Sequence, residues 1–565
     1  MPPRYGLNQG HKSPISPSHY GNSVYPRKCI LVTTAQLLRQ GSREEIWNKY
    51  CGFLDLDLPD FMAIQKRLLM EQIGLLSACE LGQKLLGDKV PASVEEFRAN
   101  VPLTTYADYM SRFADKQEAG LPAKPRWWLR TSGRTGEIGG FKWAPYTPDM
   151  AKKLGEVVFA LFMLAAVDGR GQFPFAEGDR LLYTMAPFPY MSGGVSRALL
   201  EEFPFTFLPP LEKAEQMPYE ERIKEGLWLA LRDGIDHINA ISVVLVRIAQ
   251  QFSDGSGNMR PVQFLLHPPA MVRLIRGLLR ARMAGRKELL PKDLWTVKGI
   301  ATGGTDTELF RDQIRAAWGR DTVEAYGCTE AGLFALQPWA NQGLVFLPHV
   351  DFLEFIPMDE FARNEADPTY QPRTVLLNEV EVGGIYEVVV TNFYGGAYTR
   401  YRVGDLIRIN ALEDETLKIK IPKMVFHSKV HDIIDLASFA RLTERTIWQA
   451  IVDLGIPYED WTARKEYHDG RPYLYVYVET RDPASNVSEV TSRLDQNLRK
   501  LDVAYGEMHE MMGMDPLRVV LLVPGAFKRF TQSRQAQGAD LAHLKPTHMQ
   551  ISDGDMRLLL TEAGN

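Results

Sequence analysis

The chain has 565 residues, of which 45% are hydrophobic and 24% charged, so it is expected to fold into two or more globular domains. Its 65 basic and 70 acidic residues give a net charge of −5, which provides no positive footprint for nucleic acid. The four cysteines are scattered without metal-binding spacing, and these features together predict a cytoplasmic protein that binds neither nucleic acid nor a membrane.

The N-terminal residues 1–30 are rich in Pro, Ser and Gly and lack the apolar core of a signal peptide, so a disordered tail is expected. Apolar residues at three- and four-residue spacing predict helices from Thr34 to Leu86. The apolar run Val157–Val167 predicts a buried helix, because it is shorter than the ~20 residues that a membrane-spanning helix needs.

Short strand-like segments alternate with helical ones between this run and Glu330. Such alternation predicts an α/β domain whose helices cover a largely buried sheet. Strands and turns dominate from 343 to 410, and we expect a β-rich, barrel-like portion joined to the main sheet.

A second, smaller domain is predicted after the charged turn Glu413–Lys423. The remaining sequence alternates strand, helix and strand, and it has the usual size of a domain. The predicted organisation is therefore a tail over 1–30, a large α/β domain over 31–420 and a small α+β domain over 421–565.

A stretch rich in glycine and hydroxyl groups, RTSGRTGEIGGFKWAP, occupies Arg130–Pro145 and is expected to be a loop rather than a packed strand. Backbone N–H groups, hydroxyls and cationic side chains in such a loop surround phosphate oxygens in many proteins. Neither the G-x-x-x-x-G-K-[ST] spacing nor G-x-G-x-x-G is present here. Taken alone, an ordinary flexible connection explains this stretch equally well.

Three later segments complete a pattern. ATGG (Ala301–Gly304) has two glycines that let a flat ring approach the backbone, and YGCTE (Tyr326–Glu330) combines an aromatic ring, a hydroxyl and a carboxylate. YTRYRVGDLIRI (Tyr398–Ile409) carries Asp405 directly before a strand. An aromatic ring for adenine, one carboxylate for ribose, another for Mg²⁺ and hydroxyls for phosphate together describe an ATP site.

In this order the four segments resemble the adenylate-forming superfamily of acyl-CoA synthetases, luciferase and adenylation domains. The closer resemblance is to the auxin-responsive acyl-acid amido synthetases of plants and bacteria, with this chain as a bacterial-type member. The segments that carry it are VPLTTYADYMSRF, YGCTEAG, FLPHVDFLEFIP, GIYEVVVTNFYGGAYTRYRVGDLIRI and PGAFKRF with GADLAHLKPTH, and they span about Leu37 to Met549.

The resemblance implies a large adenylating domain with a small, mobile C-terminal lid. It also implies an ATP-dependent ligase that adenylates a carboxylic acid and transfers the acyl group to an amine, an amino acid in this family, releasing AMP and pyrophosphate. ATP would be a substrate and Mg²⁺ a cofactor. Two other functions stay open, an acyl-CoA synthetase with a thiol acceptor and a catalytically degenerate nucleotide- or acid-binding protein.

The resemblance further assigns roles to single residues. Glu330 would hold Mg²⁺, Thr329 would contact the α-phosphate, and Lys545 would reach from the lid towards the developing charge. The loop would hold phosphate, Tyr326 would frame adenine and Asp405 would accept both ribose hydroxyls. The implied nucleotide-binding residues are Thr131, Ser132, Gly133, Arg134, Thr135, Gly136, Gly303, Gly304, Tyr326, Gly327, Asp405 and Lys429.

The sequence departs from the family pattern at two places. Arg134 stands where the family loop has a hydroxyl, and LKPTH (Leu544–His548) keeps Lys545 but has His548 in place of a final arginine. A further group, Phe188, Tyr190 and Met191, lines an acyl pocket or belongs to the core, and the sequence leaves both interpretations open.

Overall fold

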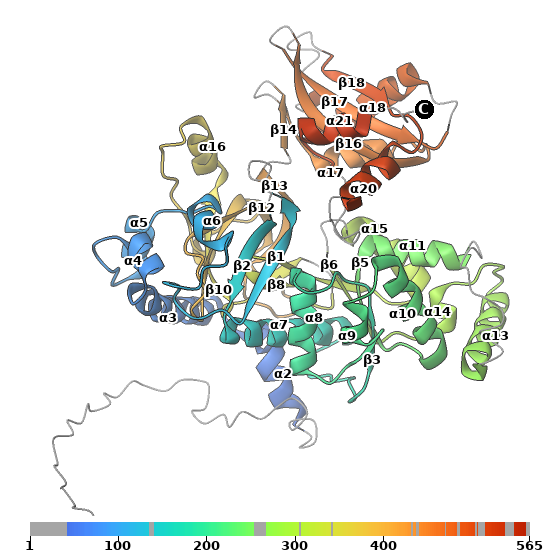
Figure 1. Cartoon of the computed structure of the whole chain (residues 1–565), viewed down its shortest axis with the longest axis horizontal. Coiled ribbons are helices and arrows are strands. Elements are labelled where there is room, and N and C mark those ends of the chain that lie inside the picture. The colour runs from blue at the N-terminus through green and yellow to red at the C-terminus, as the bar shows by residue number, and fades with distance from the viewer. Residues whose placement is uncertain are drawn as a thin grey trace, which may run out of the picture.

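The computed structural model describes residues 42–134, 141–253, 267–303, 307–340, 343–430, 433–436, 440–468, 471–482, 486–502, 505–506, 515–536 and 547–560 (Figure 1). The tail expected over 1–30 lies outside these residues and stays a prediction. Within the described ranges, none of the helices has both the length and the apolarity needed to cross a bilayer.

Helices open the described chain, as predicted for Thr34 to Leu86. They are α2 (Arg43–Cys51), the 3₁₀ turn η1 (Gly52–Asp55), α3 (Leu58–Ser77), α4 (Glu80–Leu86), α5 (Val94–Asn100) and α6 (Ala107–Phe113). Helix α3 begins where the Asp57 carboxylate accepts a hydrogen bond from Asp60 N–H, and a proline lies in its first turn. Its apolar side, which includes Phe61, Leu69 and Leu76, is buried.

A hairpin and a long buried helix follow. Strands β1 (Trp127–Arg134) and β2 (Phe141–Tyr146) pair antiparallel. Helix α7 (Pro148–Ala166) then confirms the buried helix predicted from the run Val157–Val167, because every residue from 157 to 167 is buried. The hydroxyl of Thr147 caps this helix by accepting a hydrogen bond from Met150 N–H at 3.2 Å.

One eleven-stranded sheet forms the centre of the large domain, in the order β10-β11-β12-β13-β9-β8-β7-β6-β5-β3-β4. Its parallel half comprises β3 (Arg180–Tyr183), β4 (Thr206–Leu208), β5 (His237–Ile241), β6 (Gly299–Gly303) and β7 (Thr322–Cys328). Its antiparallel half comprises β8 (Gly332–Leu336), β9 (Leu344–Phe346), β10 (Asp351–Pro357), β11 (Ile385–Asn392), β12 (Tyr401–Ala411) and β13 (Lys423–Lys429). The predicted α/β architecture is confirmed, and the change of strand direction occurs at β7.

The β-rich portion expected over 343–410 is joined to the main sheet, as predicted. In the described residues, its strands are the antiparallel half of that sheet and end at the edge strand β10, and its barrel-like shape stays a prediction. Hydrogen-bonded pairing of β13 with β9 makes the two parts continuous.

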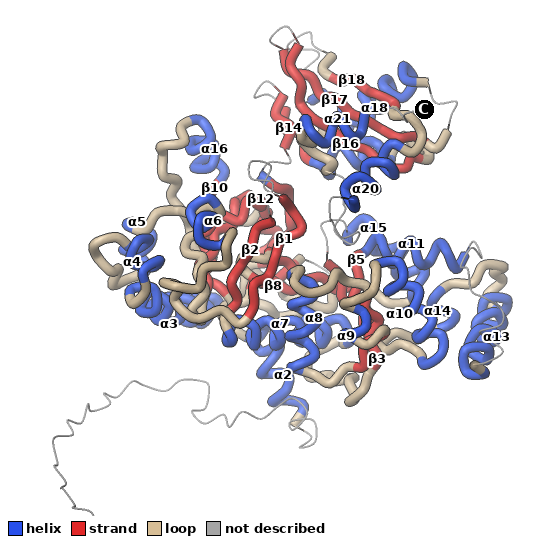
Figure 2. Tube along the Cα trace, in the orientation of Figure 1, coloured by secondary structure: helices blue, strands red, loops and turns tan. Residues whose placement is uncertain are grey.

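Helices cover both halves of the sheet (Figure 2). Around the parallel half lie α8 (Met191–Glu202), α9 (Leu211–Ala214), α10 (Tyr219–Asp233), α11 (Ser242–Ser253), α13 (Pro268–Met283), α14 (Pro291–Leu294) and α15 (Thr307–Trp318). Around the antiparallel half lie α16 (Met358–Ala366), the 3₁₀ turn η2 (Leu377–Glu379) and the N-terminal helices. In Figure 1, α13 occupies the far right end of the molecule.

The C-terminal residues build a separate α+β unit, seen at the top of Figure 1. Its elements are β14 (Ile433–Leu436), β15 (Ala440–Thr443), α17 (Glu444–Val452), β16 (Tyr458–His468), β17 (Arg471–Thr480), α18 (Val487–Leu501), β18 (Leu517–Leu521), α20 (Ala526–Ala536) and α21 (Asp553–Leu560). The three-stranded sheet β16-β17-β18 packs on α17 and α18 around its own core, which includes Trp461 and Leu494. Because β13 still belongs to the large sheet, we propose that the domain boundary lies after Lys429 rather than at 420/421.

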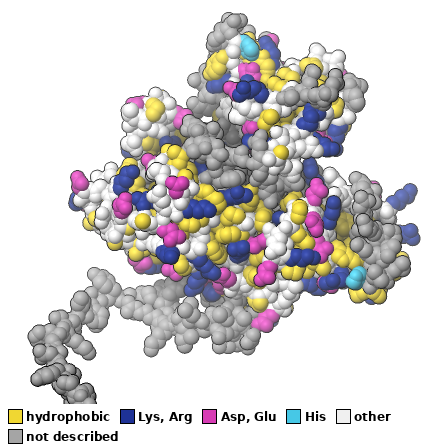
Figure 3. Space-filling model, in the orientation of Figure 1, with side chains coloured by type: hydrophobic (Ala, Val, Ile, Leu, Met, Phe, Trp, Pro, Cys, Tyr) yellow, Lys and Arg dark blue, Asp and Glu magenta, His cyan; other side chains and the backbone are white. Residues whose placement is uncertain are grey.

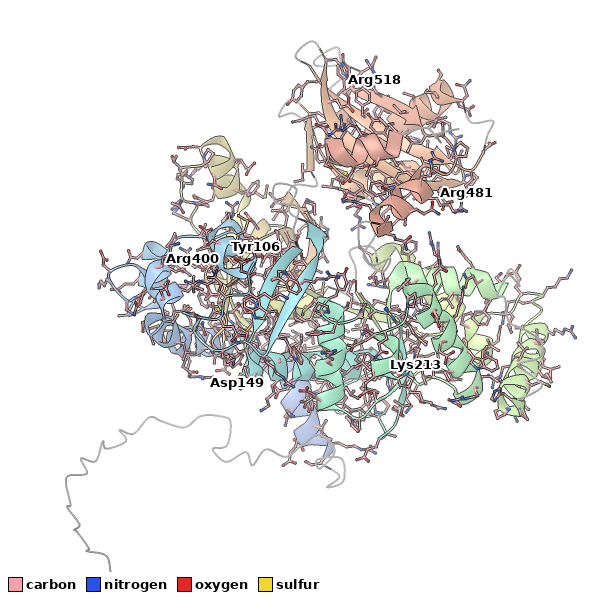
Figure 4. The ribbon with its side chains drawn as sticks, in the orientation of Figure 1. Tyr106, Asp149, Lys213, Arg400, Arg481 and Arg518 are labelled. Atoms are coloured by element: carbon pink, nitrogen blue, oxygen red, sulfur yellow. The ribbon has the colours of Figure 1, made fainter. Side chains whose placement is uncertain are left out.

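A buried ion pair fixes the start of β12. The Arg400 guanidinium donates to both carboxylate oxygens of Glu354, at 2.8 and 3.1 Å, and to the carbonyl of Arg98 at 2.7 Å. The side chains of Arg400 and Glu354 are only 5% and 1% exposed. Arg400 thereby joins β12 to β10 and to the end of α5. It is labelled in Figure 4 and lies just before the segment that carries Asp405.

Replacing Arg400 with methionine is expected to lower the free energy of unfolding by about 3 kcal/mol, because the buried Glu354 charge would keep only the Thr374 hydroxyl at 2.6 Å and the more distant Arg98 at 4.0 Å. Chemical denaturation followed by tryptophan fluorescence measures this loss. The matched control is Arg67→Met, whose pair with Glu71 is about 60% exposed on both sides and should contribute less than ~1 kcal/mol. Equal effects of the two substitutions would show that the buried pair does not hold β12.

Candidate functional site

Tyr326, Asp405 and Glu330, three of the predicted site residues, meet where the sheet changes from parallel to antiparallel. Strand β7 is parallel to β6 and antiparallel to β8, and Tyr326 and Gly327 lie near its carboxyl end. In open α/β sheets, ligands bind beyond the carboxyl ends of strands at such a change of order. A Cβ atom on Gly327 would lie 1.9 Å from the carbonyl oxygen of Gly332, so only glycine allows the close return into β8.

The first contact across the site joins Tyr326 on β7 to Asp405 on β12. The Tyr326 hydroxyl donates to Asp405 Oδ2 at 2.9 Å. Four steps of strand order separate β7 from β12, which is roughly 19 Å in a flat sheet, so the antiparallel half must curl to bring them together. Burial, and then the Asp405 charge, raise the pKa of Tyr326 well above its ordinary value, which keeps the hydroxyl a donor.

The second contact holds Glu330 in the turn after β7. The Tyr401 hydroxyl donates to Glu330 Oε1 at 3.0 Å, and the side-chain amide of Asn392 donates to the Glu330 carbonyl at 3.1 Å. Glu330 is only 8% exposed. Burial and the Glu330 carboxylate both raise the pKa of Tyr401, so this tyrosine also stays protonated. The carboxylate is thus fixed from β12 and its backbone from β11.

The hairpin β1–β2 packs against the same turn. The Tyr146 hydroxyl, at the end of β2, donates to the Thr329 carbonyl at 2.9 Å and lies 3.5 Å from Met191 Sδ. Thr329 itself is 9% exposed. Met191, predicted for an acyl pocket, therefore lies beside the turn that carries Thr329 and Glu330.

The expected phosphate loop is partly strand, which corrects the prediction for Arg130–Pro145. Residues 127–134 form β1 and residues 141–146 form β2. The two strands pair antiparallel, and the register of the pairing shifts between Arg130 and Arg134, so the small residues of this stretch are accommodated in a strand. Thr131 is half-buried. For Ser132, Gly133 and Arg134 the structure gives the backbone alone, and Thr135 and Gly136 lie outside the described residues.

Arg130 connects β1 to the segment after β3. Its backbone N–H donates to the Pro189 carbonyl at 2.9 Å, and its guanidinium lies 4.0 Å from the centre of the Tyr190 ring. Tyr190 is 3% exposed, which favours a core position over a pocket wall. The ring of Phe188 is covered by the Arg197 guanidinium at 3.9 Å.

The remaining nucleotide-binding candidates lie on strands around this point. Gly303 is the last residue of β6, and among the residues that the structure describes a Cβ atom there would meet no atom within 4 Å, so these residues leave space next to its backbone. Lys429 on β13 is exposed and is the register partner of Asp405 on β12. Gly304 lies outside the described residues.

In the C-terminal domain, Lys545 lies outside the described residues, whereas His548 has well-defined partners. Its imidazole stacks on Trp461 with ring centres 4.5 Å apart, and contacts the carboxylates of Glu444 at 2.6 Å and Asp460 at 2.9 Å. Burial alone would lower the pKa of His548, but hydrogen bonds to Asp460 and Glu444 raise it to about 9. The histidine is therefore a cation at neutral pH, as the family's arginine is.

Three supporting residues were missed by sequence reasoning: Tyr146, Asn392 and Tyr401. Tyr401 lies within the quoted segment YTRYRVGDLIRI, where an aromatic hydroxyl four residues before Asp405 was an available signal. Tyr146 and Asn392 carry no local signal, because their partners lie 183 and 62 residues away in the sequence. In the described ranges, no group of three or more His, Cys, Asp or Glu residues could hold a metal ion.

Comparison with known proteins identifies related chains. Family models match at residues 53–187 (GH3 family N-terminal domain), 344–429 (GH3 family central domain) and 444–553 (GH3 family C-terminal domain), which together cover more than half of the sequence. A jasmonoyl–L-amino acid synthetase of Oryza sativa subsp. japonica is 28% identical over 213 residues, covering 35% of this chain and 35% of that protein. Matches to the first curated relatives span only 33% to 46% of their length.

Two solved structures share the fold. An acyl acid amido synthetase in complex with 2,4-DB superimposes with a TM-score of 0.65 at 16% identity, over 92% of this chain and 96% of that one. A 2-hydroxyisobutyryl-CoA ligase in its postadenylation state gives a TM-score of 0.55 at 14% identity, over 86% of this chain and 90% of that one.

The His548 contacts predict a pH dependence of stability. Because the pKa of His548 is about 9 in the folded chain against 6.5 for an ordinary histidine, its contribution is fully present below pH 6.5 and is lost as pH rises through 9. We expect the stability difference between the wild type and His548→Gln to shrink by on the order of 3 kcal/mol across this window. Denaturation series at several pH values measure it.

The matched control is His468→Gln, which replaces a histidine of the same domain whose side chain is 54% exposed. A pH-independent difference for His548→Gln would mean that the imidazole is neutral between the two carboxylates.

Proposed function

The chain belongs to the GH3 family, and we propose that it is an ATP-dependent, AMP-forming ligase that joins a carboxylic acid to an amine. The observation that carries the proposal is the pair of contacts Tyr326–Asp405 and Tyr401–Glu330. They bring an aromatic ring and two carboxylates from different segments to the place in the sheet where α/β proteins bind ligands. These are the groups that recognition of a nucleotide and its metal ion requires.

In this proposal, ATP binds across the carboxyl end of β7. Asp405 accepts the ribose hydroxyls, Tyr326 packs against adenine, and the open backbone at Gly303 lets the flat ring approach. Thr131–Gly136 bind the phosphates, where Arg134 adds a cation for the β- or γ-phosphate oxygens. The support is the position of the hairpin β1–β2 against the turn that carries Thr329, through the contact that Tyr146 of β2 makes with the Thr329 carbonyl.

The residues present fit a Mg²⁺ ion that is held mainly by substrate. Mg²⁺ prefers oxygen ligands and is commonly bound by one or two carboxylates together with substrate phosphates. Glu330 supplies one such carboxylate, oriented by the Tyr401 hydroxyl. Bound Mg²⁺ would neutralise charge on the phosphate oxygens of ATP.

The first half-reaction needs positioning and charge neutralisation rather than a protein nucleophile. A carboxylate oxygen of the acid attacks the α-phosphorus, the bond to pyrophosphate breaks, and an acyl-adenylate forms beside Thr329. Cys328 takes no part as a nucleophile, because burial and the nearby Glu330 and Asp405 charges raise the pKa of its thiol well above the usual value.

In the second half-reaction an amine attacks the acyl carbon, loses a proton and displaces AMP. Lys545 of the C-terminal domain approaches the developing negative charge. Movement of that domain as a lid takes the enzyme from the first half-reaction to the second. The similarity to the rice jasmonoyl–L-amino acid synthetase supports an amino acid as the amine.

An acyl-CoA synthetase is the second candidate, since the 2-hydroxyisobutyryl-CoA ligase shares the fold and the adenylating step. The two functions differ only in the acceptor. A panel of carboxylic acids assayed with ATP, followed by amino acids or coenzyme A as the acceptor, separates them: amide product supports our proposal, and thioester product alone contradicts it.

The site itself is tested by exchange of labelled pyrophosphate into ATP, which requires adenylation and no acceptor. We expect acid-dependent exchange in the wild type. Asp405→Asn should weaken ATP binding roughly tenfold to a hundredfold, because each lost hydrogen bond to a charged acceptor costs about 1.5–3 kcal/mol. Asp359→Asn, an exposed aspartate on α16, is the matched control. Absence of exchange with every acid tested, in a protein that binds ATP, would support the degenerate binding protein.

Tyr401→Phe tests the metal role of Glu330 without changing the carboxylate. Loss of the orienting hydroxyl should raise the Mg²⁺ concentration for half-maximal exchange by roughly tenfold or more, and leave ATP binding in the absence of metal unchanged. Glu330→Gln should reduce exchange further, because a neutral amide binds Mg²⁺ poorly. Tyr467→Phe, a tyrosine that is 63% exposed, is the control. A Mg²⁺ titration of Tyr401→Phe that matches wild type would remove Glu330 from the metal site.

A further inference from the structure

Helix α13 (Pro268–Met283) exposes an apolar stripe on the side opposite to its packing face. Ala270, Gly277 and Ala281 are its buried residues. Gly277 allows close packing, because a Cβ atom there would lie 2.6 Å from Leu294 Cδ2 of α14. At 3.6 residues per turn, Ile275 and Leu279 point away from this face, and they are 50% and 53% exposed.

The stripe continues along most of the helix. Val272 and Met283 fall at the i−3 and i+4 positions of Ile275 and Leu279, and they are 44% and 88% exposed. Leu278, next to them, is 41% exposed. Single exposed hydrophobic residues are common on protein surfaces, whereas a contiguous stripe of large ones indicates an interaction site.

Arginines flank this stripe on both sides. Arg282 lies on one side and Arg276 and Arg280 on the other; all three are exposed, and Arg280 also donates to the Asp293 carbonyl of α14 at 3.2 Å. The helix PPAMVRLIRGLLRARM contains no acidic residue. Other cations of this region are already engaged: Arg273 donates to backbone carbonyls of α10, and Arg286 pairs with Asp293 at 2.6 Å. Figure 3 shows Lys and Arg side chains projecting at the right-hand edge of the molecule, where α13 lies in Figure 1.

We propose that α13 is an interfacial helix with which the protein binds the surface of a membrane that contains anionic lipids. An apolar stripe with cationic flanks and no acidic residue is the pattern of helices that lie in the plane of a bilayer surface, with the stripe among the acyl chains and the arginines at the headgroups. The helix is about 24 Å long and stands at one end of the molecule.

Charge complementarity favours this occupant over a second copy of the chain. Two α13 stripes packed against each other would bring the arginines of both copies together, and like charges oppose that contact. A membrane surface instead supplies negative charge. The proposal adds a partner that the composition gave no reason to expect, because the net charge of −5 describes the whole chain and not this helix.

The test is sedimentation of the full chain with sucrose-loaded vesicles. We expect binding to vesicles of equal parts phosphatidylglycerol and phosphatidylcholine, weak binding to pure phosphatidylcholine, and a loss of binding as salt is raised. Arg276→Gln with Arg282→Gln should lower the partition coefficient about 25-fold, since each cation near an anionic surface contributes about fivefold. Ile275→Ser with Leu279→Ser should abolish sedimentation.

Matched controls use exposed residues elsewhere in the large domain. Arg67→Gln with Lys89→Gln removes two charges from residues whose side chains are 60% and 76% exposed, and Leu75→Ser with Val382→Ser removes two exposed apolar side chains. Both controls should sediment as wild type does.

Three outcomes would overturn the proposal. The first is equal sedimentation of wild type and both α13 variants, which would place the lipid contact elsewhere. The second is a concentration-dependent dimer that Ile275→Ser with Leu279→Ser disrupts, which would make the stripe a contact between two copies. The third is absence of binding to either vesicle together with a lower melting temperature of that variant, which would mean that the chain itself covers the stripe.

Discussion

Two hydrogen bonds from buried tyrosines to carboxylates determine the arrangement of the site, Tyr326 to Asp405 and Tyr401 to Glu330. A carboxylate removed from water needs donors, and a tyrosine whose pKa is raised by burial supplies one at any physiological pH. Each bond joins the region of β7 to β12, residues 79 and 71 positions apart in the sequence. Curling of the antiparallel half of the sheet is the consequence, and it gathers the proposed nucleotide contacts at one place.

The surroundings make this arrangement rigid. Arg400 anchors the start of β12 to β10 through Glu354, and Asn392 holds the backbone of the Glu330 turn from β11. In the C-terminal domain, the His548 cation between Glu444 and Asp460 fixes the chain three residues after Lys545 to β16. The large domain therefore positions the proposed ATP contacts, while the small domain holds His548, three residues after the proposed lysine. Contact between the domains includes the pair Arg445–Glu308 at 3.1 Å.

Local residue patterns were sufficient to predict the α/β architecture and the buried helix α7, because the spacing of apolar residues is contained in a short stretch of sequence. Residue types also singled out Tyr326 and Asp405, which the structure brings into contact, while their roles stay proposals. The strand character of Arg130–Arg134 was not predictable, since it depends on pairing with β2. The roles of Tyr146 and Asn392 depend on partners far along the chain. Helix α13 illustrates the same limit: its sequence is apolar on two sides, and packing of Gly277 on α14 decides which of them is exposed.

The central claim is that the end of β7 binds a nucleotide through Asp405 and Tyr326. Co-crystallisation with AMP and Mg²⁺ tests it most directly. The account predicts that the ribose hydroxyls lie within hydrogen-bond distance of the Asp405 carboxylate, with adenine against the Tyr326 ring and the phosphate beside Thr329. A nucleotide bound elsewhere, or bound here with the ribose turned away from Asp405, would contradict it.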